Sequence, residues 1–295
     1  RWFNKSEKAF ASSFMLGGAF IGPVFGPAIT VALMLAFGWR MVFVIFGAAG
    51  LVLAALWWFF GKNNPRQSPF VNEAEIAHIE SGMEQVDASA AKQVAPWSKF
   101  ITSSQFWAIG IQYFITDYIM YVFLAWLPLY LMEAHGYSLA KMGVAASFPW
   151  AALAIITFIT GFISDKLIAG GMSKYTARTF FGILGLILSG TALYLAATAT
   201  SQTMNLVWLT VSLGSLGFTF NASWASCIDI GCKFSGTVSG WMNFWGNLGG
   251  VAAPTLTAWI ATTYGWQAAI LATAFSAVVG VISWLLVKPD KPLVG

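Results

Sequence analysis

The stretch that decides the fold runs from residue 10 to residue 60 and reads FASSFMLGGAFIGPVFGPAITVALMLAFGWRMVFVIFGAAGLVLAALWWFF. Arg40 is its only ionisable residue. A helix needs about 20 apolar residues to cross the roughly 30 Å hydrocarbon core of a bilayer. The stretch therefore predicts two membrane spans, at residues 10–36 and 41–60, joined by a short turn at Arg40.

The composition of the whole chain agrees with a membrane protein and excludes a soluble one. Apolar residues make up 58% of the 295 positions and charged residues only 9%, whereas soluble domains carry about 25% charged residues. The net charge of +4 and the pI near 9.1 do not indicate a nucleic-acid partner. The basic residues lie in short segments between apolar runs, where they set orientation in the bilayer.

Six further spans follow by the same criterion. They are expected at residues 106–131, 143–163, 180–197 and 206–228, and as two spans in the uncharged stretch 234–287, which divides at 262–266. With both chain ends cytoplasmic, thirteen of the fifteen basic residues lie inside and only Arg40 and Lys141 lie outside, as the positive-inside rule predicts. We therefore expect an all-α, multi-pass protein with eight transmembrane helices.

One long polar stretch, residues 62–105, separates two spans before it from six after it. It holds five of the eleven acidic residues, and its pattern predicts an amphipathic helix near residues 72–86. The expected organisation is a remnant of an N-terminal transmembrane bundle at 1–61, a cytoplasmic central loop at 62–105, a six-helix bundle at 106–288 and a cytoplasmic tail at 289–295.

Five positions recur at a constant offset of 227 residues. Gly22, Pro27, Thr30, Gly38 and Trp39 correspond to Gly249, Pro254, Thr257, Gly265 and Trp266. Chance explains one match but hardly five, so we expect two parallel halves. The counterpart of residue 106 would fall about 121 residues before Arg1 (106 − 227), with room for roughly four more spans. The chain is therefore expected to lack the first part of its N-terminal half.

Four local motifs together resemble one protein family. Residues 2–9, Trp-Phe-Asn-Lys-Ser-Glu-Lys-Ala, are similar to the pattern Trp-Phe-Pro-x-x-Glu-Arg-x-x-Ala, with Asn4 in the place of proline. Residues 18–27 carry glycines at every fourth position before Pro27, and residues 161–166 read Gly-Phe-Ile-Ser-Asp-Lys. Residues 229–250 are similar to Asp-Ile-Gly-Gly-x-x-x-Gly-Thr-Val-Ser-Gly-x-x-Asn-x-x-Gly-Asn, with Cys232 at the second glycine. These motifs resemble the anion:cation symporters of the major facilitator superfamily, which include phthalate and sugar-acid permeases.

The resemblance implies the major facilitator fold and a secondary transporter. Such a protein imports an organic anion, for example a hexuronate, an aldonate or an aromatic carboxylate, by proton-coupled symport with alternating access. It implies a monomer in a bacterial cytoplasmic (inner) membrane and no cofactor besides the coupling cation, H⁺ or else Na⁺. A drug or metabolite exporter of the same fold and a non-transporting sensor or scaffold remain as alternatives. An enzyme is not expected, because neither a nucleophile with a base nor a metal site is visible.

Ionisable side chains at membrane depth are costly and are therefore candidates for function. Asp117 lies near the middle of the third span, where burial favours the neutral acid and so makes proton uptake possible. Proton coupling or substrate contact is the expected role, and a purely structural acid is the alternative. Glu7 matches a glutamate of the resembled family that takes part in proton coupling in some members.

Substrate contacts are expected from three spans. Asn243 and Asn247 lie four residues apart on one helix face, and a carboxamide offers both a donor and an acceptor to a hydroxylated or carboxylate ligand. Contacts between helices are the alternative. The resemblance adds cavity residues on two further spans, with Gln112 and Tyr113 competing for one role: Asn221, Ser223, Trp224, Gln112, Tyr113, Tyr121 and Trp126.

Asp165, Lys166 and Arg178 are expected to form a cytoplasmic charge network that favours one conformation, as the matched motif implies. An ordinary orienting loop is the alternative. No metal site is expected from the two cysteines and two histidines. No Lys or Arg lies near the centre of a predicted span, so the countercharge for an anion is expected on the spans before Arg1.

Overall fold

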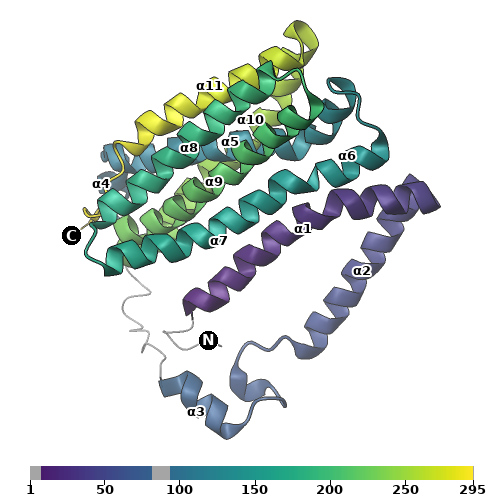
Figure 1. Cartoon of the computed structure of the whole chain (residues 1–295). Coiled ribbons are helices and arrows are strands. Elements are labelled where there is room, and N and C mark those ends of the chain that lie inside the picture. Colours follow the sequence, from purple (N-terminus) through teal and green to yellow (C-terminus); the bar gives the residue numbers. More distant parts are fainter. Residues whose placement is uncertain (1–7, 82–93, 295) are drawn as a thin grey trace.

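The computed structural model describes residues 8–81 and 94–294, and within these two ranges all regular secondary structure is helical. The elements are α1 (Lys8–Phe37), α2 (Trp39–Phe60), the 3-10 helix η1 (Pro65–Gln67), α3 (Glu73–Ser81), α4 (Trp97–Ile101), α5 (Ser104–Glu133), α6 (Leu139–Ala145), α7 (Ser147–Ala169), α8 (Lys174–Thr198), α9 (Gln202–Gly231), η3 (Cys232–Phe234), α10 (Ser235–Tyr264) and α11 (Trp266–Trp284). Figure 1 shows their arrangement. The prediction of an all-α protein is confirmed.

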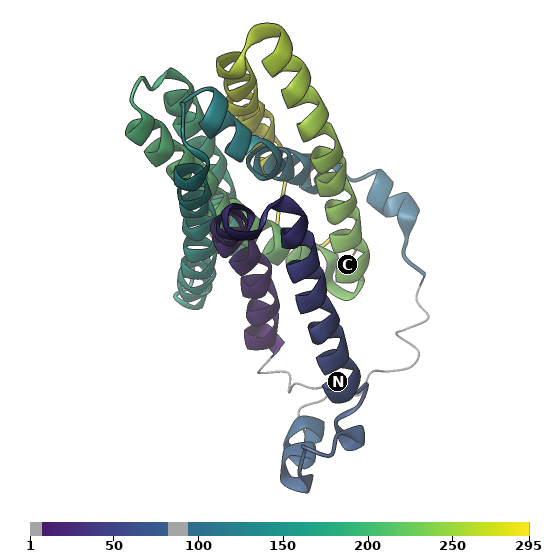
Figure 2. The same cartoon turned by 90° about the vertical axis from the view of Figure 1, so that its right-hand side faces the viewer.

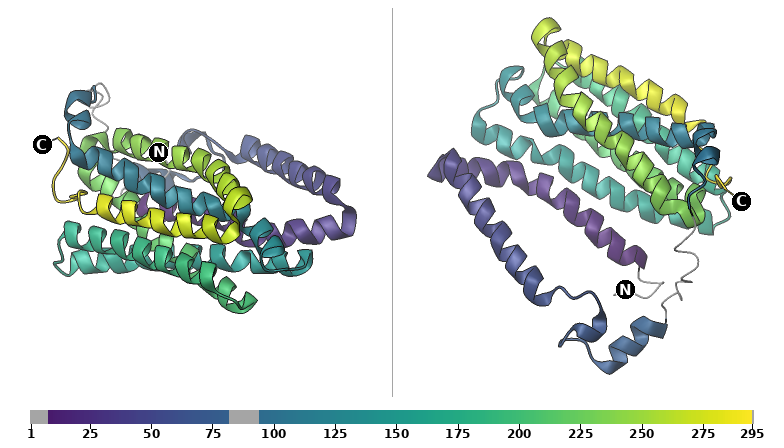
Figure 3. Two further views of the ribbon diagram at one scale, coloured as in Figure 1. Left: turned by 90° about the horizontal axis from the view of Figure 1, so that it is seen from above. Right: turned by 180° about the vertical axis from the view of Figure 1, so that it is seen from behind.

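The long helices from α5 to α11 form one bundle (Figures 1 and 3). The main pairings are α8 with α9, α5 with α10, and α7 with α9, while α11 packs on both α8 and α5. We call the end of the bundle at which the C-terminus lies the tail end, and the opposite end the far end. The starts of α5 and α8 and the end of α9 all lie at the tail end.

Seven helical segments of the described residues are long and apolar enough to cross a membrane. They match the predicted spans in position, except that two predicted spans fall within one 63-residue segment, Gln202–Tyr264. That segment contains α9, η3 and α10, and the chain turns back at Cys232, whose φ is 45°. A 30-residue helix such as α9 or α10 is about 45 Å long, which exceeds the hydrocarbon core.

The repeat of 227 residues is also present in the backbone. Gly38 joins α1 to α2 with φ 80° and ψ 160°, and Gly265 joins α10 to α11 with φ 87° and ψ 164°. Gly38 N donates to Met34 O and Gly265 N donates to Ala261 O, both at 2.9 Å. Because glycine populates such positive φ values without steric cost, the recurrence of glycine at both junctions has a conformational cause.

The first two long helices stand beside the bundle (Figure 2). α1 packs on α6 and α7, where a Cβ at Gly143 would lie only 2.9 Å from Val31. Phe20 of α1 also contacts Phe220 of α9, with 6.3 Å between ring centroids. α2 packs on α1, and most of its side chains are exposed.

The polar stretch before α5 contains part of the predicted amphipathic helix. α3 ends at Ser81 within the described residues, and the remainder of the predicted range 72–86 lies outside them. α4 is attached to the bundle through Phe100, which is fully buried and stacks on Phe106 with 5.2 Å between centroids. The end of this stretch is therefore fixed to the start of α5.

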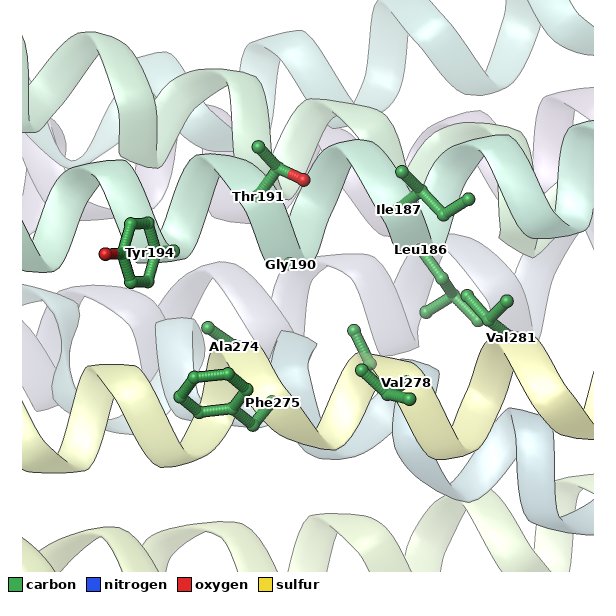
Figure 4. Close-up of a pocket in the computed structure, with 10 residues that line it drawn as sticks. Leu186, Ile187, Gly190, Thr191, Tyr194, Ala274, Phe275, Val278 and Val281 are labelled. Atoms are coloured by element: carbon green, nitrogen blue, oxygen red, sulfur yellow. The ribbon is translucent and has the colours of Figure 1, made fainter.

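A groove of about 340 Å³ lies between α8 and α11 (Figure 4). Its walls include Leu186, Ile187, Tyr194, Phe275 and Val278, several of which are exposed on the outside of the bundle. The lining is almost entirely apolar, and no predicted site residue belongs to it. This groove is therefore not a candidate site for an anion.

Candidate functional site

Asp117 lies halfway along α5, which packs against α9 and α10. Its side chain is 6% exposed, and its Oδ1 has no hydrogen-bond partner among the described residues. None of the ion pairs within that part of the chain includes it. A buried polar group without a partner costs free energy of folding. Asp117 is therefore poorly explained by a role in stability and is a strong candidate for a functional residue.

Two glycines let α10 approach α5 at the level of Asp117. A Cβ at Gly246 would overlap the carboxylate of Asp117, and a Cβ at Gly249 would overlap the backbone carbonyl of Phe114. Small residues on a helix face allow close packing of membrane helices. The sequence motif included both glycines, but their relation to Asp117 depends on a tertiary contact that the motif alone does not give.

Tyr113 lies one turn before Asp117 on α5 and is joined to α9. Trp224 Nε1 donates a hydrogen bond of 3.0 Å to the Tyr113 hydroxyl, and the two rings pack edge to face with 6.2 Å between centroids. Phe220 of α9 also packs edge to face on the Tyr113 ring, with 5.8 Å between centroids. The indole uses only an acceptor position of the Tyr113 hydroxyl, and no other residue within 8–81 and 94–294 accepts its proton, so the hydroxyl can donate to a ligand.

Gln112 and Ser223 form a second link between the same two helices. Ser223 Oγ lies 3.1 Å from Gln112 Oε1, and Gln112 Nε2 donates to Ile109 O at 3.0 Å. Both side chains are fully buried. Of the two residues that competed for one role, Gln112 ties α5 to α9, and Tyr113 lies beside Asp117.

The three asparagines lie on α9 and α10, which both pack against α5. Asn243 and Asn247 are exposed on α10, and Asn247 Nδ2 donates to Asn243 O at 2.8 Å. Asn221 of α9 is half-buried and lies against Gly161 of α7, where a Cβ would meet its Nδ2 at 2.9 Å. The Asn243 carboxamide retains its own donors and acceptor for a ligand.

Tyr121 and Trp126 extend the predicted site along α5 toward the far end. The Tyr121 ring packs on Gly250. Trp126 Nε1 donates to Pro254 O at 3.2 Å, and its ring lies 6.1 Å from that of Trp266. Nine residues of helix separate Trp126 from Asp117, about 13 Å. The structure therefore does not bring Trp126 together with the Asp117 cluster.

A second polar cluster lies at the tail end, between α7, α8 and α9. Arg178 lies 3.2 Å from Asp165 and donates to Ser164 Oγ at 2.7 Å. Asp229 Oδ1 accepts a hydrogen bond of 2.7 Å from Lys174 Nζ, and Asp229 Oδ2 lies 3.6 Å from Arg178 Nε. The side chains of Asp229 and Arg178 are each only 11% exposed, whereas that of Asp165 is 74% exposed. We call these four side chains, Asp165, Lys174, Arg178 and Asp229, the ionic cluster. Asp229 is its central acid.

Lys166 does not join the ion pairs at the tail end. The Lys166 ammonium lies 5.1 Å from the centre of the Phe162 ring and makes no ion pair within the described residues. Residues Asp165 and Lys166 both belong to α7, and neighbouring residues on a helix point in directions about 100° apart, so only one of them faces Arg178. Glu7 lies outside the described residues.

Sequence reasoning overlooked Asp229 as a partner of Arg178, and Lys174 as the second partner of Asp229. Asp229 is the only charged residue between Arg178 and Lys233, and an isolated acid in so long an apolar stretch is a signal that a partner exists. Residues 8–81 and 94–294 contain no group of three or more His, Cys, Asp or Glu side chains that could hold a metal ion.

Comparison with known proteins gives a consistent result. Residues 1–254 match the family model described as Major Facilitator Superfamily. The chain is 32% identical over 309 residues to a probable galactarate/D-glucarate transporter of Bacillus subtilis, covering 99% of this chain and 66% of that protein. It is 27% identical over 289 residues to a probable chloroplastic anion transporter of Oryza sativa, covering 96% of this chain and 48% of that protein.

A solved structure shares the fold. The bacterial homologue of the human lysosomal transporter Spinster, in an inward-facing and unoccupied conformation, has a TM-score of 0.74 and 18% identity, and the match covers 96% of this chain and 71% of that one. The chain spans about half to two thirds of the length of the first curated relatives it matches. A membrane protein with this fold, these motifs and transporters as relatives is not an enzyme, and the chain belongs to the major facilitator superfamily.

Proposed function

We propose that the protein is a secondary transporter that moves a small organic anion together with a proton by alternating access. Relatives are named as transporters of galactarate and D-glucarate, of D-galactonate and of sulfoacetate. These compounds are small acids, and two of the three names denote polyhydroxylated sugar acids. A sugar acid is therefore the substrate class that we favour over an aromatic carboxylate.

The buried carboxyl group of Asp117 is the observation that carries the proton coupling. An anionic substrate beside Tyr113 would lie close to Asp117, and two like charges in a poorly solvated site repel each other strongly. Anion binding is then favoured when Asp117 carries a proton. Because coupling between two ligands is reciprocal, the bound anion also strengthens proton binding at Asp117. The two enter and leave together.

The neighbouring side chains supply donors for a carboxylate and for hydroxyl groups. The hydroxyl of Tyr113, one turn before Asp117 on α5, can donate its proton, and the exposed carboxamides of Asn243 and Asn247 lie on α10 close in sequence to Gly246. Trp224 sets the position of Tyr113, and the Gln112–Ser223 pair fixes α5 against α9. Asn221 and Tyr121 are proposed as contacts at the edges of the site, whereas Trp126, about 13 Å along α5 from Asp117, is not.

The ionic cluster at the tail end is proposed to favour one conformation of the transport cycle. It joins the ends of three helices through Asp165, Arg178, Asp229 and Lys174. We assign the tail end to the cytoplasm, because most basic residues lie in segments on that side of the predicted topology. We also propose eight crossings, with α9 and α10 as separate spans, and a monomer in a bacterial inner membrane.

Uptake into proteoliposomes tests this function. The protein, made with any sequence that its gene encodes on either side of this chain, is reconstituted and offered radiolabelled aldarate, aldonate, hexuronate and aromatic acids, with and without an inward proton gradient. We expect the gradient to drive accumulation of at least one sugar acid. If the proton gradient changes the uptake of none of these acids, or if it drives only their export from the proteoliposomes, the proposal of a symporter is wrong.

Asp117→Asn tests the coupling residue. We expect the variant to lose gradient-driven accumulation but to keep exchange of labelled for unlabelled substrate, which needs no net proton movement. Glu133→Gln is the matched control, since Glu133 is exposed at the far end and glutamine keeps an acceptor for the Trp266 indole. Unchanged accumulation in Asp117→Asn at equal protein content would contradict the assignment.

A further inference from the structure

The seven residues after Val287 cross the tail end of the bundle rather than leaving it. We call Lys288–Val294 the strap. Pro289 is buried, and Leu293 and Val294 pack against the hydrophobic core. Figure 1 shows the C-terminus at the same end of the bundle as α4 and the start of α8. The strap was predicted from the sequence only as a tail.

The first attachment of the strap is to α5. The side chain of Gln105, in the first turn of α5 and 8% exposed, bonds to the strap backbone at two places. Its Oε1 accepts from Lys288 N at 2.6 Å, and its Nε2 donates to Lys291 O at 2.9 Å. Both hydrogen-bonding groups of one buried carboxamide are thus used to fix the strap, and removing it would leave two backbone groups without partners.

The second and third attachments close two helix ends. Asp290 Oδ1 accepts from Tyr175 N at 3.0 Å, in the first turn of α8. Leu293 N donates to Ile230 O at 2.9 Å, in the last turn of α9. Backbone N–H groups at a helix start and carbonyls at a helix end have no partner within the helix, and a negative side chain at a helix start is favoured by the helix dipole.

These two attachments lie directly beside the ionic cluster. Tyr175 follows Lys174, and Ile230 follows Asp229, and Lys174 and Asp229 form the 2.7 Å ion pair. The same two helix ends are therefore joined twice, once by opposite charges and once by the strap. With the strap attached to both helix ends, Asp229 lies 2.7 Å from Lys174 and 3.6 Å from Arg178.

We propose that the strap makes the tail ends of α5, α8 and α9 move as one rigid unit and positions the ionic cluster. Gln105 and Asp290 are its positioning residues. The proposal does not depend on the transported substrate or on proton coupling, because it concerns only the contacts between helix ends.

Hydrogen exchange measured by mass spectrometry on the protein in lipid nanodiscs tests this proposal. In Asp290→Ala we expect the Leu293 amide to exchange about tenfold faster, which corresponds to about 1.4 kcal/mol. The reason is that release at α8 should free the strap at α9 as well. Asp290→Asn keeps the Oδ1 acceptor and should restore protection. Lys291→Ala is the control, since the described strap contacts use only the backbone of Lys291.

A second variant tests whether the strap acts as a unit. Gln105→Leu should accelerate the same Leu293 amide, and the double variant with Asp290→Ala should add little, because contacts within one cooperative unit are not additive. If Asp290→Ala accelerates exchange only at Tyr175 and leaves Leu293 protected, Asp290 is a local helix cap and the proposal is wrong. Fully additive effects of the two substitutions would overturn it as well.

Discussion

The backbone of Gly246 on α10 lies directly against the carboxylate of Asp117 on α5. A Cβ at position 246 would overlap that carboxylate and lie 2.7 Å from the Tyr113 ring. We expect Gly246→Ala to lower the free energy of unfolding by about 1–3 kcal/mol, the usual cost of overpacking. Thermal unfolding in one detergent measures the change.

Gly240→Ala is the matched control for this prediction. It makes the same substitution on the same helix, but no atom lies within 4 Å of a Cβ at Gly240. Alanine is a better helix former than glycine, so this variant should be neutral or slightly more stable. Equal melting temperatures for the two variants would contradict the close approach at Gly246.

The Tyr113 hydroxyl should matter for both stability and binding. Tyr113→Phe leaves the Trp224 indole N–H without its acceptor, and a lost partner of this kind costs about 1 kcal/mol or more. It also removes the proposed donor to the substrate, so we expect substrate affinity in a calorimetric titration to fall about tenfold. Tyr264→Phe is the control, because Tyr264 is exposed outside the proposed site and its hydroxyl makes no hydrogen bond within the described residues. A similar loss in both variants would argue against a special role of Tyr113.

Asp229 should contribute more to stability than Asp165, although the sequence motif drew attention to Asp165. Asp229→Asn leaves Arg178, whose side chain is only 11% exposed, without its central acid. We expect a loss of about 3 kcal/mol, the lower end for breaking a buried ion pair. Asp165→Asn removes an exposed pair and should cost less than about 1 kcal/mol. Denaturant unfolding measures the loss of stability in both variants. A larger loss in Asp165→Asn than in Asp229→Asn would refute the assignment of Asp229 as the central acid.

Cys232 occupies a backbone conformation that suits glycine, with φ 45° and ψ −118° at the end of α9. Cys232→Gly should therefore raise the free energy of unfolding by about 1 kcal/mol. Cys227→Ala removes the other thiol, which is buried against Met242, and should lower stability because it opens a cavity. Opposite shifts of the melting temperature are the expected result. A loss of stability in Cys232→Gly would show that the thiol outweighs the strain.

His135 at the far end predicts a dependence of stability on pH. Partial burial lowers the pKa of His135 below its usual value of 6.5, and its Nε2 lies 3.0 Å from the Tyr130 hydroxyl. The folded protein therefore binds fewer protons than the unfolded chain just below pH 6.5, so stability should fall as pH decreases through this range. His135→Gln should flatten the fall. Unfolding at pH values from 5 to 8 measures the difference.

The sequence predicted the helices well because hydrophobic runs and charges define spans without any tertiary information. The positions of the helix ends were predicted less accurately. α8 begins at Lys174, six residues before the predicted start at 180, since a helix continues through polar residues once it leaves the apolar core. The Ser173 side chain, which accepts from Thr176 N, is a helix-start signal that could have corrected this boundary.

The site was predictable only in part, because its contacts join residues far apart in the chain. Burial of Asp117 followed from its place within a span, but its contact with Gly246 and the bond from Trp224 to Tyr113 depend on how α5 is rotated against α9 and α10. A one-residue shift would have exchanged Gln112 for Tyr113, as the sequence left open. The attachment of the strap to Gln105 leaves no pattern in the sequence at all.

The strap has a practical consequence for how the protein is produced. Purification tags and fluorescent proteins are sometimes inserted next to segments such as the strap. Val294 directly follows Leu293, whose amide is bonded to Ile230, so a bulky partner inserted after Val294 without a spacer would strain the attachment of the strap to α9. A flexible Gly/Ser spacer before the inserted partner should preserve the hydrogen bond between Leu293 and Ile230.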